Sequence, residues 1–245
     1  MKILSALALL FGWGLVQQAS AATVSVAVAA NFTATANQLA HAFKAETGDN
    51  LALSFGATGA LYTQITQGAP FEILLSADDT RTKTAIREGF GIAGTDFTYA
   101  LGALVLYSPK LDVSVGASSL DLQFQKLAIA DLKAAPYGAA AIETLMTLGK
   151  LDALTPKFVT GENITQTLQF VETGNAELGF VAASQVMGKA HQWAVPPEMH
   201  KPIRQDAVLL RPGEGDPAAT AFLKFLQSPA AISIIEAAGY TVPKP

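Results

Sequence analysis

Apolar positions in the first part of the chain alternate between short β-rich runs and stripes with helical spacing. Three apolar runs predict strands, at residues 23–29, 51–55 and 71–75. The clearest stripe recurs at the spacing of one helix face and consists of Phe32, Ala36, Leu39 and Phe43, with Gly48 after it. Shorter helices are predicted after the second and third runs. Strands and helices that alternate in this way predict a parallel sheet covered by helices.

A second set of the same kind follows from about residue 103. Strands are predicted at residues 103–107, 127–130, 157–160 and 177–181. Helices are predicted at residues 139–148 and at the stripe Ile164, Leu168 and Val171. The proline-rich segment 192–203 is predicted to be a connection without an element. A late strand at 207–210 and helices at about 217–226 and 229–238 follow.

These two sets predict an α/β fold of two lobes, each a mostly parallel sheet flanked by helices. Lobe I is predicted at residues 22–100 plus 206–245, and lobe II at residues 101–205. The chain then leaves lobe I near residues 99–101 and returns near 204–206, so two crossing strands form a hinge. A single doubly wound sheet is the alternative interpretation of the pattern.

Residues 1–21 have the composition of a secretory signal peptide. Lys2 gives the positive start, residues 3–16 form an uncharged apolar stretch, and Ala19-Ser20-Ala21 is a small-residue cleavage pattern. The apolar stretch is shorter than the roughly 20 residues that a membrane-spanning helix needs. An N-terminal membrane anchor is the alternative. We therefore expect an exported protein.

Composition narrows the function classes further. The chain has 245 residues, with 16 Lys or Arg, 20 Asp or Glu and a net charge of −4. A mildly acidic chain with few aromatic residues lacks the basic patch and the stacking side chains that nucleic-acid binding requires. Cysteine is absent, which excludes disulfides, thiolate metal sites, a cysteine nucleophile and a lipid-modified N-terminal cysteine. An exported chain without a lipid anchor is expected in the periplasm.

Motifs of catalysis are missing from the sequence. No Gly-x-Ser-x-Gly elbow and no Gly-x4-Gly-Lys-Ser/Thr phosphate loop occurs. The histidines His41, His191 and His200 have neither metal-ligand spacing nor an evident nucleophile as partner. We therefore predict a binding protein without a cofactor and not an enzyme. An exported hydrolase is the alternative from another class.

One local design recurs at four corners of the chain: a strand end, then small or hydroxyl residues, then a helix start. The corners are Ala29–Asn31, Gly56–Gly59, Pro136–Gly138 and Gly161–Ile164. A helix N-terminus presents free backbone N–H groups and a partial positive charge, so it attracts anions. Asn31, Thr58 and Tyr137 add side-chain donors. Because two corners fall in each predicted lobe, the sequence predicts one anion site between the lobes, with neutral donors only.

Each corner also has an interpretation without a ligand. Asn31, Thr58 and Asn163 are common N-cap residues, which satisfy the first amides of their own helices. Tyr137 follows Pro136, and its ring could pack in a simple turn. The pattern alone leaves both interpretations open.

At these corners the sequence resembles the periplasmic molybdate-binding proteins of ABC-type importers. The matching segments are VAVAANF (26–32), SFGATGALYTQITQGAPFEILLSAD (54–78), APYGAAAIETL (135–145), KFVTGENITQTLQFVETGNAELGFVAASQ (157–185) and AAGYTV (237–242). The segments extend over nearly the whole chain after residue 21. The resemblance implies a type II periplasmic-binding-protein-like fold, whose two lobes close by a hinge on one tetrahedral oxyanion.

The resemblance also implies which residues contact the ligand. First-lobe contacts come from the polar residue after Ala-Ala in the first strand and from the second hydroxyl position of a Ser-Phe-Gly-Ser-Ser-Gly segment, here Asn31 and Thr58. Second-lobe contacts come from the residue before the Gly of the Pro-x-Gly turn and from the backbone amide after Glu-Asn, here Tyr137 and Ile164. Ala30 adjoins the first contact and is a further candidate.

Two positions depart from the pattern of that family. Ala57 replaces a serine of many relatives, so one hydroxyl is lost. Ala182 stands where some relatives have a ligand-binding tyrosine, and Tyr137 on the opposite wall is the candidate donor in its place. These departures predict a shifted set of contacts for the same class of ligand.

By this resemblance we expect a monomer that captures molybdate or tungstate and delivers it to a membrane permease driven by an ATPase. The two anions are nearly the same size, so the sequence does not separate them. A sulfate or phosphate binder is the alternative within the class; phosphate usually requires a carboxylate acceptor, and Glu162 is the acidic residue beside a corner. A sensor domain of the same fold is a further alternative.

Overall fold

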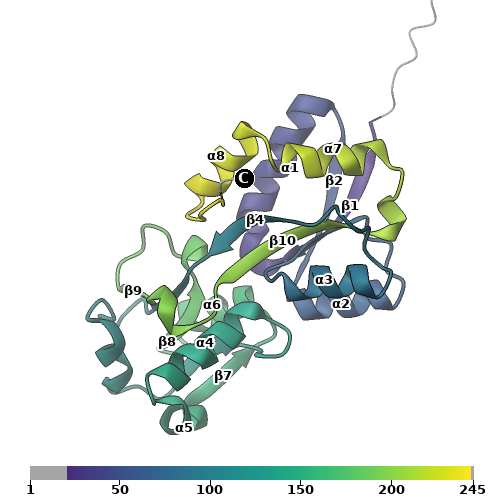
Figure 1. Cartoon of the computed structure of the whole chain (residues 1–245). Helices are drawn as coiled ribbons and strands as arrows, with labels where there is room; N and C mark the ends of the chain where they lie inside the picture. Colours follow the sequence, from purple (N-terminus) through teal and green to yellow (C-terminus); the bar gives the residue numbers. More distant parts are fainter. Residues whose placement is uncertain (1–20, 244–245) are drawn as a thin grey trace, which may run out of the picture.

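Two five-stranded sheets, each flanked by helices, form the two lobes of the described chain (Figure 1). The structure is a computed structural model that describes residues 21–243. The predicted signal peptide, residues 1–21, lies outside the described residues apart from Ala21. The two sheets confirm the predicted α/β fold of two lobes.

The first sheet has the strand order β2-β1-β3-β10-β4. Its strands are β1 (Thr23–Ala29), β2 (Asn50–Gly56), β3 (Ile73–Leu75), β4 (Phe97–Gly102) and β10 (Ile203–Leu209). β1 pairs in parallel with β2 and β3, whereas β10 pairs antiparallel with both β3 and β4. β10 is therefore the single reversed strand in a sheet whose other strands run in one direction.

Helices cover both faces of this sheet. One face carries α1 (Thr33–Thr47), α7 (Pro217–Phe225) and α8 (Pro229–Ala237), and the other carries α2 (Thr58–Thr66) and α3 (Thr80–Arg87). The side chains of β1 alternate between these faces, because Val26 and Val28 join one apolar cluster and Ala27 joins the other. A strand that is buried on both faces needs an apolar residue at nearly every position, as the run at residues 23–29 provides.

The second sheet repeats this plan with the order β7-β6-β8-β5-β9. Its strands are β5 (Leu104–Tyr107), β6 (Leu127–Ala130), β7 (Phe158–Gly161), β8 (Leu178–Ala182) and β9 (Gln192–Ala194). β6 pairs in parallel with β7 and β8, whereas β5 is antiparallel to both β8 and β9. One face is covered by α4 (Pro136–Thr147) and α5 (Leu151–Leu154), and the other by α6 (Ile164–Glu172).

Short 3-10 helices fill several connections. They are η1 (Ala30–Phe32), η2 (Gly116–Asp121), η3 (Thr155–Lys157), η4 (Ala183–Gln185), η5 (Pro197–Met199) and η6 (Arg211–Gly213). η1 follows β1 directly and precedes α1, so it forms the first predicted corner. The α1 stripe is confirmed, because Ala36, Leu39 and Phe43 are buried and Gly48 ends the helix at a φ of 84°.

Two chain segments connect the lobes, one after β4 and one before β10 (Figure 1). β4 and β10 are antiparallel neighbours, and their register shifts between Gln205 and Asp206. Tyr99 is the extra residue of β4 opposite this shift, which forms a β-bulge. The lobe boundaries at residues 22–100 plus 206–245 and 101–205 stay a prediction.

The expectation that residues 192–203 form no element is wrong. β9 pairs with β5, with Trp193 opposite Leu106, and η5 follows it. Trp193 packs against the core of the second lobe. Tertiary packing therefore makes a strand where the local proline content favours a connection.

Within residues 21–243, no single helix has both the length and the apolar composition to cross a membrane. α7 and α8 meet that standard only when taken as a pair, which is bent by 59°. Both pack on the first sheet, where the ring centroid of Phe222 lies 5.3 Å from that of Phe43.

Candidate functional site

The four predicted corners meet at one cavity between the lobes. The cavity is small, because the centre of a water-sized sphere can reach only about 10 Å3 of it. The cavity is lined by Ala29, Ala30, Asn31, Gly56, Ala57, Thr58, Ala77, Ala135, Pro136, Tyr137 and Ile164. This set contains all five predicted site residues, and its members come from both lobes. Ala57 belongs to it, whereas Ala182 is buried in β8 outside it.

The lining of this cavity contains no charged side chain. His41, His191 and His200 do not belong to the lining either. Within residues 21–243, no group of three or more His, Asp or Glu residues could hold a metal ion. Any ligand of this cavity is therefore bound by backbone groups and neutral side chains.

Thr58 is the first residue of α2, and its side chain is almost fully buried. The backbone N–H has no acceptor within the helix, because the first turn of a helix leaves its amides free. The Ala77 N–H donates to Thr58 Oγ1 at 3.0 Å. A hydroxyl that accepts in this way keeps its own proton for another acceptor. Thr58 can thus offer two donors to an anion in the cavity.

Ile164 holds the same position in α6, because it is the first residue of that helix. Asn163 is the N-cap, and its Oδ1 accepts from the backbone N–H groups of Thr165 at 2.9 Å and Gln166 at 3.0 Å. The N-cap interpretation is therefore right for Asn163. The Ile164 N–H precedes the capped amides and has no acceptor within the helix.

Asn31 lies within η1 and is not an N-cap residue. Its side-chain Nδ2 donates to Gln205 Oε1 at 2.8 Å and to the Tyr240 hydroxyl at 3.1 Å. The Tyr240 hydroxyl in turn donates to the Asn31 carbonyl at 2.9 Å. These contacts use both hydrogens of the Asn31 amide, whereas the sequence predicts this amide as a donor to the ligand. The backbone N–H groups of Ala30 and Asn31, at the start of η1, are the donors that the corner provides.

Tyr137 is the second residue of α4, after Pro136, and its ring belongs to the core of the second lobe. Its hydroxyl is buried and has no hydrogen-bond partner among the described residues. Burial raises the pKa of Tyr137 well above its usual range, with smaller contributions from Tyr240 and Tyr99. The hydroxyl therefore stays protonated and can donate.

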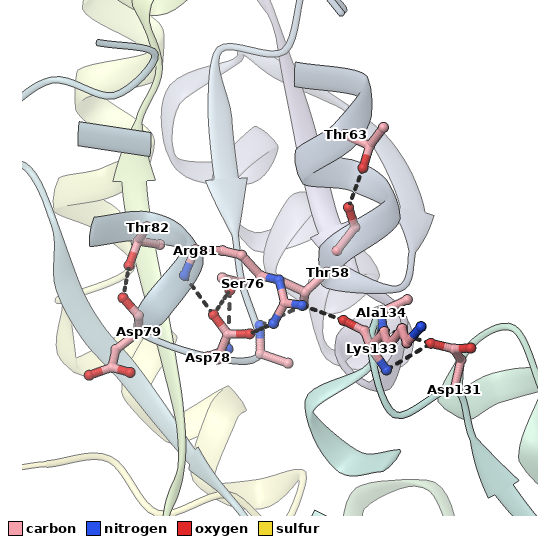
Figure 2. Close-up of polar contacts among 12 residues, drawn as sticks. Thr58, Thr63, Ser76, Asp78, Asp79, Arg81, Thr82, Asp131, Lys133 and Ala134 are labelled. Atoms are coloured by element: carbon pink, nitrogen blue, oxygen red, sulfur yellow. Dashed lines mark hydrogen bonds and ion pairs between the residues drawn. The ribbon is translucent and has the colours of Figure 1, made fainter. Parts of the chain in front are cut away.

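The cavity is closed at one edge by contacts between the lobes. The Gly59 N–H donates to the Ala134 carbonyl at 2.8 Å. Beside it, Arg81 of α3 donates to the Lys133 carbonyl at 2.5 Å and forms an ion pair with Asp78 of its own lobe (Figure 2). Arg81 thus joins one lobe to the backbone of the other without lining the cavity.

A second group of contacts also joins the two lobes. The Thr165 hydroxyl of lobe II donates to the Ala30 carbonyl at 3.2 Å. The Ser184 hydroxyl lies 2.9 Å from that of Tyr240. The two lobes therefore contact each other at residues next to the cavity lining, as in a closed binding protein.

Sequence reasoning missed three buried residues behind Asn31: Tyr99, Gln205 and Tyr240. They come from β4, from β10 and from the segment after α8. No motif links them, and only the pairing of distant segments brings them together. The one signal in the sequence is that each of them carries a polar atom within or beside an otherwise apolar segment, where a buried polar atom needs a partner.

The fold and the cavity between its lobes define a solute-binding protein that closes around a small ligand. The chain belongs to the family of bacterial extracellular solute-binding proteins, which it matches over residues 24–241. This confirms the class of protein that the resemblance of the sequence implies.

Within this family, the chain is similar to individual proteins that are named as molybdate-binding. The chain is 50% identical to the molybdate-binding protein ModA of Rhodobacter capsulatus over 239 residues, which cover 96% of this chain and 94% of ModA. It is 49% identical to ModA of Azotobacter vinelandii over 245 residues, or 97% of each chain. The solved structure of a periplasmic molybdate-binding protein from A. vinelandii superposes with a TM-score of 0.87 at 35% identity, covering 90% of this chain and 100% of the other.

Proposed function

We propose that this protein captures molybdate or tungstate in the cavity between its lobes. The observation that carries the proposal is the cavity itself, because the four residues implied by the family and the adjacent candidate Ala30 all line it and none of its residues is charged. Two relatives named as molybdate-binding proteins, about half identical over nearly the whole chain, support the same ligand.

The proposed ligand shell combines backbone and hydroxyl donors. Lobe I supplies the N–H groups of Ala30, Asn31 and Thr58 and the Thr58 hydroxyl. Lobe II supplies the Ile164 N–H and the Tyr137 hydroxyl. A fully deprotonated dianion accepts hydrogen bonds at every oxygen, so it matches a set that contains only donors. The partial positive charge at the starts of α2 and α6 adds to this attraction.

Size accounts for selection against sulfate. Closure of the lobes fixes the distances between the backbone donors, and a smaller tetrahedral anion cannot reach all of them. Each buried donor left without an acceptor costs about 1–3 kcal/mol. Molybdate and tungstate are close in size, so this set of donors treats them alike.

Hinge closure delivers the second set of donors. In the proposed cycle, lobe I (residues 22–100 plus 206–245) takes up the anion first. Lobe II (residues 101–205) then closes and brings Tyr137 and Ile164 to it. The contacts of Arg81 with Lys133 and of Thr165 with Ala30 form in the same step, since they join the two lobes.

The closed protein then delivers its ligand to a membrane permease whose ATPase drives import. The signal peptide at residues 1–21 directs export, and the protein works in the periplasm as a monomer without a cofactor and without catalysis. The family of bacterial extracellular solute-binding proteins and a relative named a molybdate-binding protein support this place in transport.

Titration calorimetry tests the ligand directly. We expect the chain without residues 1–21 to bind molybdate and tungstate with similar affinity, and sulfate and phosphate far more weakly. Sulfate that binds as tightly as molybdate would contradict the size argument. A failure of all four oxyanions to bind would reject the proposal.

A sulfate or phosphate site is the alternative. Protonated phosphate needs an acceptor, and no carboxylate lines the cavity. Glu162 is exposed, and its backbone N–H donates to Gln166 Oε1 at 2.6 Å. The lining therefore favours an anion without a proton.

A further inference from the structure

Two buried polar atoms in or near the cavity lack a hydrogen-bond partner within residues 21–243. Among the described residues, the Tyr137 hydroxyl and Gln205 Nε2 are the buried side-chain polar atoms without a hydrogen-bond partner. Tyr137 lines the cavity, whereas Gln205 does not. A buried donor without an acceptor is unfavourable, so its retention calls for a physical reason.

Both atoms converge on Gly102, the last residue of β4. A Cβ atom at this glycine would lie 2.2 Å from the Tyr137 hydroxyl and 3.0 Å from Gln205 Nε2. Only glycine leaves room for the two groups at this point of the chain. Gly102 is also where the chain leaves the first sheet for the second lobe (Figure 1). The two donors therefore meet at the crossing between the lobes.

The other end of the Gln205 amide is fixed by donors from lobe I. Gln205 Oε1 accepts from Asn31 Nδ2 at 2.8 Å, and the Tyr99 hydroxyl lies 3.3 Å from it. Tyr99 is the bulged residue of β4, and bulges often re-aim side chains beside binding sites. With Oε1 held on this side, Nε2 lies beside Gly102, which the Tyr137 hydroxyl also approaches.

We propose that Gln205 is a positioning residue of the oxyanion site. Its Oε1 holds Asn31, and with it the backbone donors of η1, while its Nε2 occupies the crossing next to the Tyr137 hydroxyl. It thereby links the donors of the two lobes through the strand β10 that connects them. This inference rests on the proposed function, because its measure is oxyanion affinity.

Gln205→Met tests the role of the amide at nearly constant volume. We expect molybdate affinity, measured by calorimetry, to fall about tenfold, since Asn31 loses its acceptor. Asp206→Asn is the matched control. Asp206 follows in the same strand and is also buried, but its Oδ1 accepts from Thr98 at 2.7 Å on the other face. We expect this control to stay within about twofold of the unaltered protein.

A double-mutant cycle separates positioning from a general loss of structure. If Gln205 acts through Asn31, then Gln205→Met adds little to the loss caused by Asn31→Ala, because the two residues form one unit. Full additivity of the two losses would contradict the proposal, as would an affinity of Gln205→Met within about twofold of the unaltered protein.

Gln205→Glu provides a second test, the pH dependence of molybdate binding, which a merely structural role of Gln205 would not change. A buried carboxyl is neutral at low pH and can accept as glutamine does, whereas its ionised form repels a dianion. The titratable neighbours are the hydroxyls of Tyr99, Tyr137 and Tyr240, whose pKa values burial raises, and Asp206 next in the strand, whose pKa burial also raises.

We therefore expect Gln205→Glu to bind molybdate nearly as the unaltered protein at about pH 6 and much more weakly at about pH 8. Asp206→Asn shows no such profile. The same loss at both pH values would overturn the inference, and thermal melting without ligand verifies that each variant is folded. If the unaltered protein does not bind molybdate, the proposed function fails as well; binding with no effect at position 205 rejects this inference alone.

Discussion

The backbone N–H of Gly59 in lobe I donates to the Ala134 carbonyl of lobe II at 2.8 Å. Gly59 directly follows Thr58, which lines the cavity, so this bond between the lobes lies one residue from the proposed site. A Cβ atom at position 59 would stand 3.0 Å from the Ala134 Cα and 3.1 Å from an Arg81 nitrogen. The close approach of the lobes therefore favours glycine here, since the neighbouring backbone would have to shift to admit a larger residue.

Gly59→Ala is expected to hinder closure without harming either lobe. Since the added methyl group meets the backbone of Ala134, we expect molybdate affinity to fall about tenfold. The free energy of unfolding without ligand should stay unchanged or rise slightly, because alanine favours the helix. Calorimetry and thermal melting measure the two quantities. Gln64→Ala, exposed on the same helix, is the control, and equal affinities of the two variants would refute the prediction.

Arg81→Ala removes a contact that joins the two lobes. The guanidinium donates to the Lys133 carbonyl across the cleft at 2.5 Å. Its loss is expected to speed molybdate release by about three- to tenfold, with little change in the association rate. Stopped-flow displacement measures the rate. Arg87→Ala, on the same helix but exposed, should release at the original rate; a similar acceleration there would point to surface charge instead.

The Thr58 hydroxyl has two proposed roles: it donates to the ligand, and it accepts from the buried Ala77 N–H. Variants at this position test both roles. Thr58→Val loses the proposed donor to the ligand, so affinity is expected to fall at least tenfold. It also leaves the buried Ala77 N–H without its acceptor, which costs about 1–3 kcal/mol of stability. Thr58→Ser keeps the hydroxyl and should preserve both properties. Binding and melting of the valine variant that match those of the serine variant would show that the hydroxyl does neither.

Tyr137→Phe should affect binding and stability in opposite directions. The hydroxyl has no partner among the described residues, so its removal is expected to leave the unliganded protein equally stable or slightly more stable. Affinity for molybdate should nevertheless fall about tenfold or more, since a donor to a charged ligand is lost. Tyr107→Phe, at a buried tyrosine of β5 outside the cavity, is the control. A destabilised variant with intact affinity would contradict the proposed role.

Buried tyrosines should make the protein sensitive to alkali. Burial raises the pKa of Tyr240 to about 12, against about 10 in an unfolded chain. Between these values the unfolded chain releases a proton that the folded chain retains. The contribution of Tyr240 to the free energy of unfolding should therefore be constant below about pH 10 and be lost as pH rises toward 12.

Denaturant unfolding at pH 8 and at pH 11 measures this loss. Tyr240→Phe should lose less stability between the two pH values than the unaltered protein does, although it starts lower because the hydroxyl bonds to Asn31 and Ser184 are gone. Equal losses in the two proteins would assign the alkaline effect to other groups.

The sequence predicts the corners because they depend on local rules. A strand end followed by small residues and a helix start requires only neighbouring residues, so Thr58 and Ile164 fall where the pattern predicts them. Hydrophobic spacing likewise predicts the sheets and most of the helices. β9 escapes prediction because its partner strand and the packing of Trp193 outweigh its composition.

Side-chain direction at the first corner depends on distant parts of the chain. The amide of Asn31 bonds to Gln205, 174 positions away, and to Tyr240, 209 positions away. No short-range signal encodes such contacts, because they exist only once β10 and the C-terminal segment have joined the first sheet. The same is true of Arg81, whose acceptor at Lys133 belongs to the other lobe.

The position of Ile164 at the start of α6 has a consequence for how such a protein can diverge. A contact made by a backbone N–H does not depend on which side chain the residue carries, although proline is forbidden because it lacks that hydrogen. Because the Ile164 side chain is buried in the core, descendants of this chain could place another apolar residue of similar size at this corner and keep their ligand. A shared function would then remain recognisable from the course of the backbone after the sequences themselves have diverged.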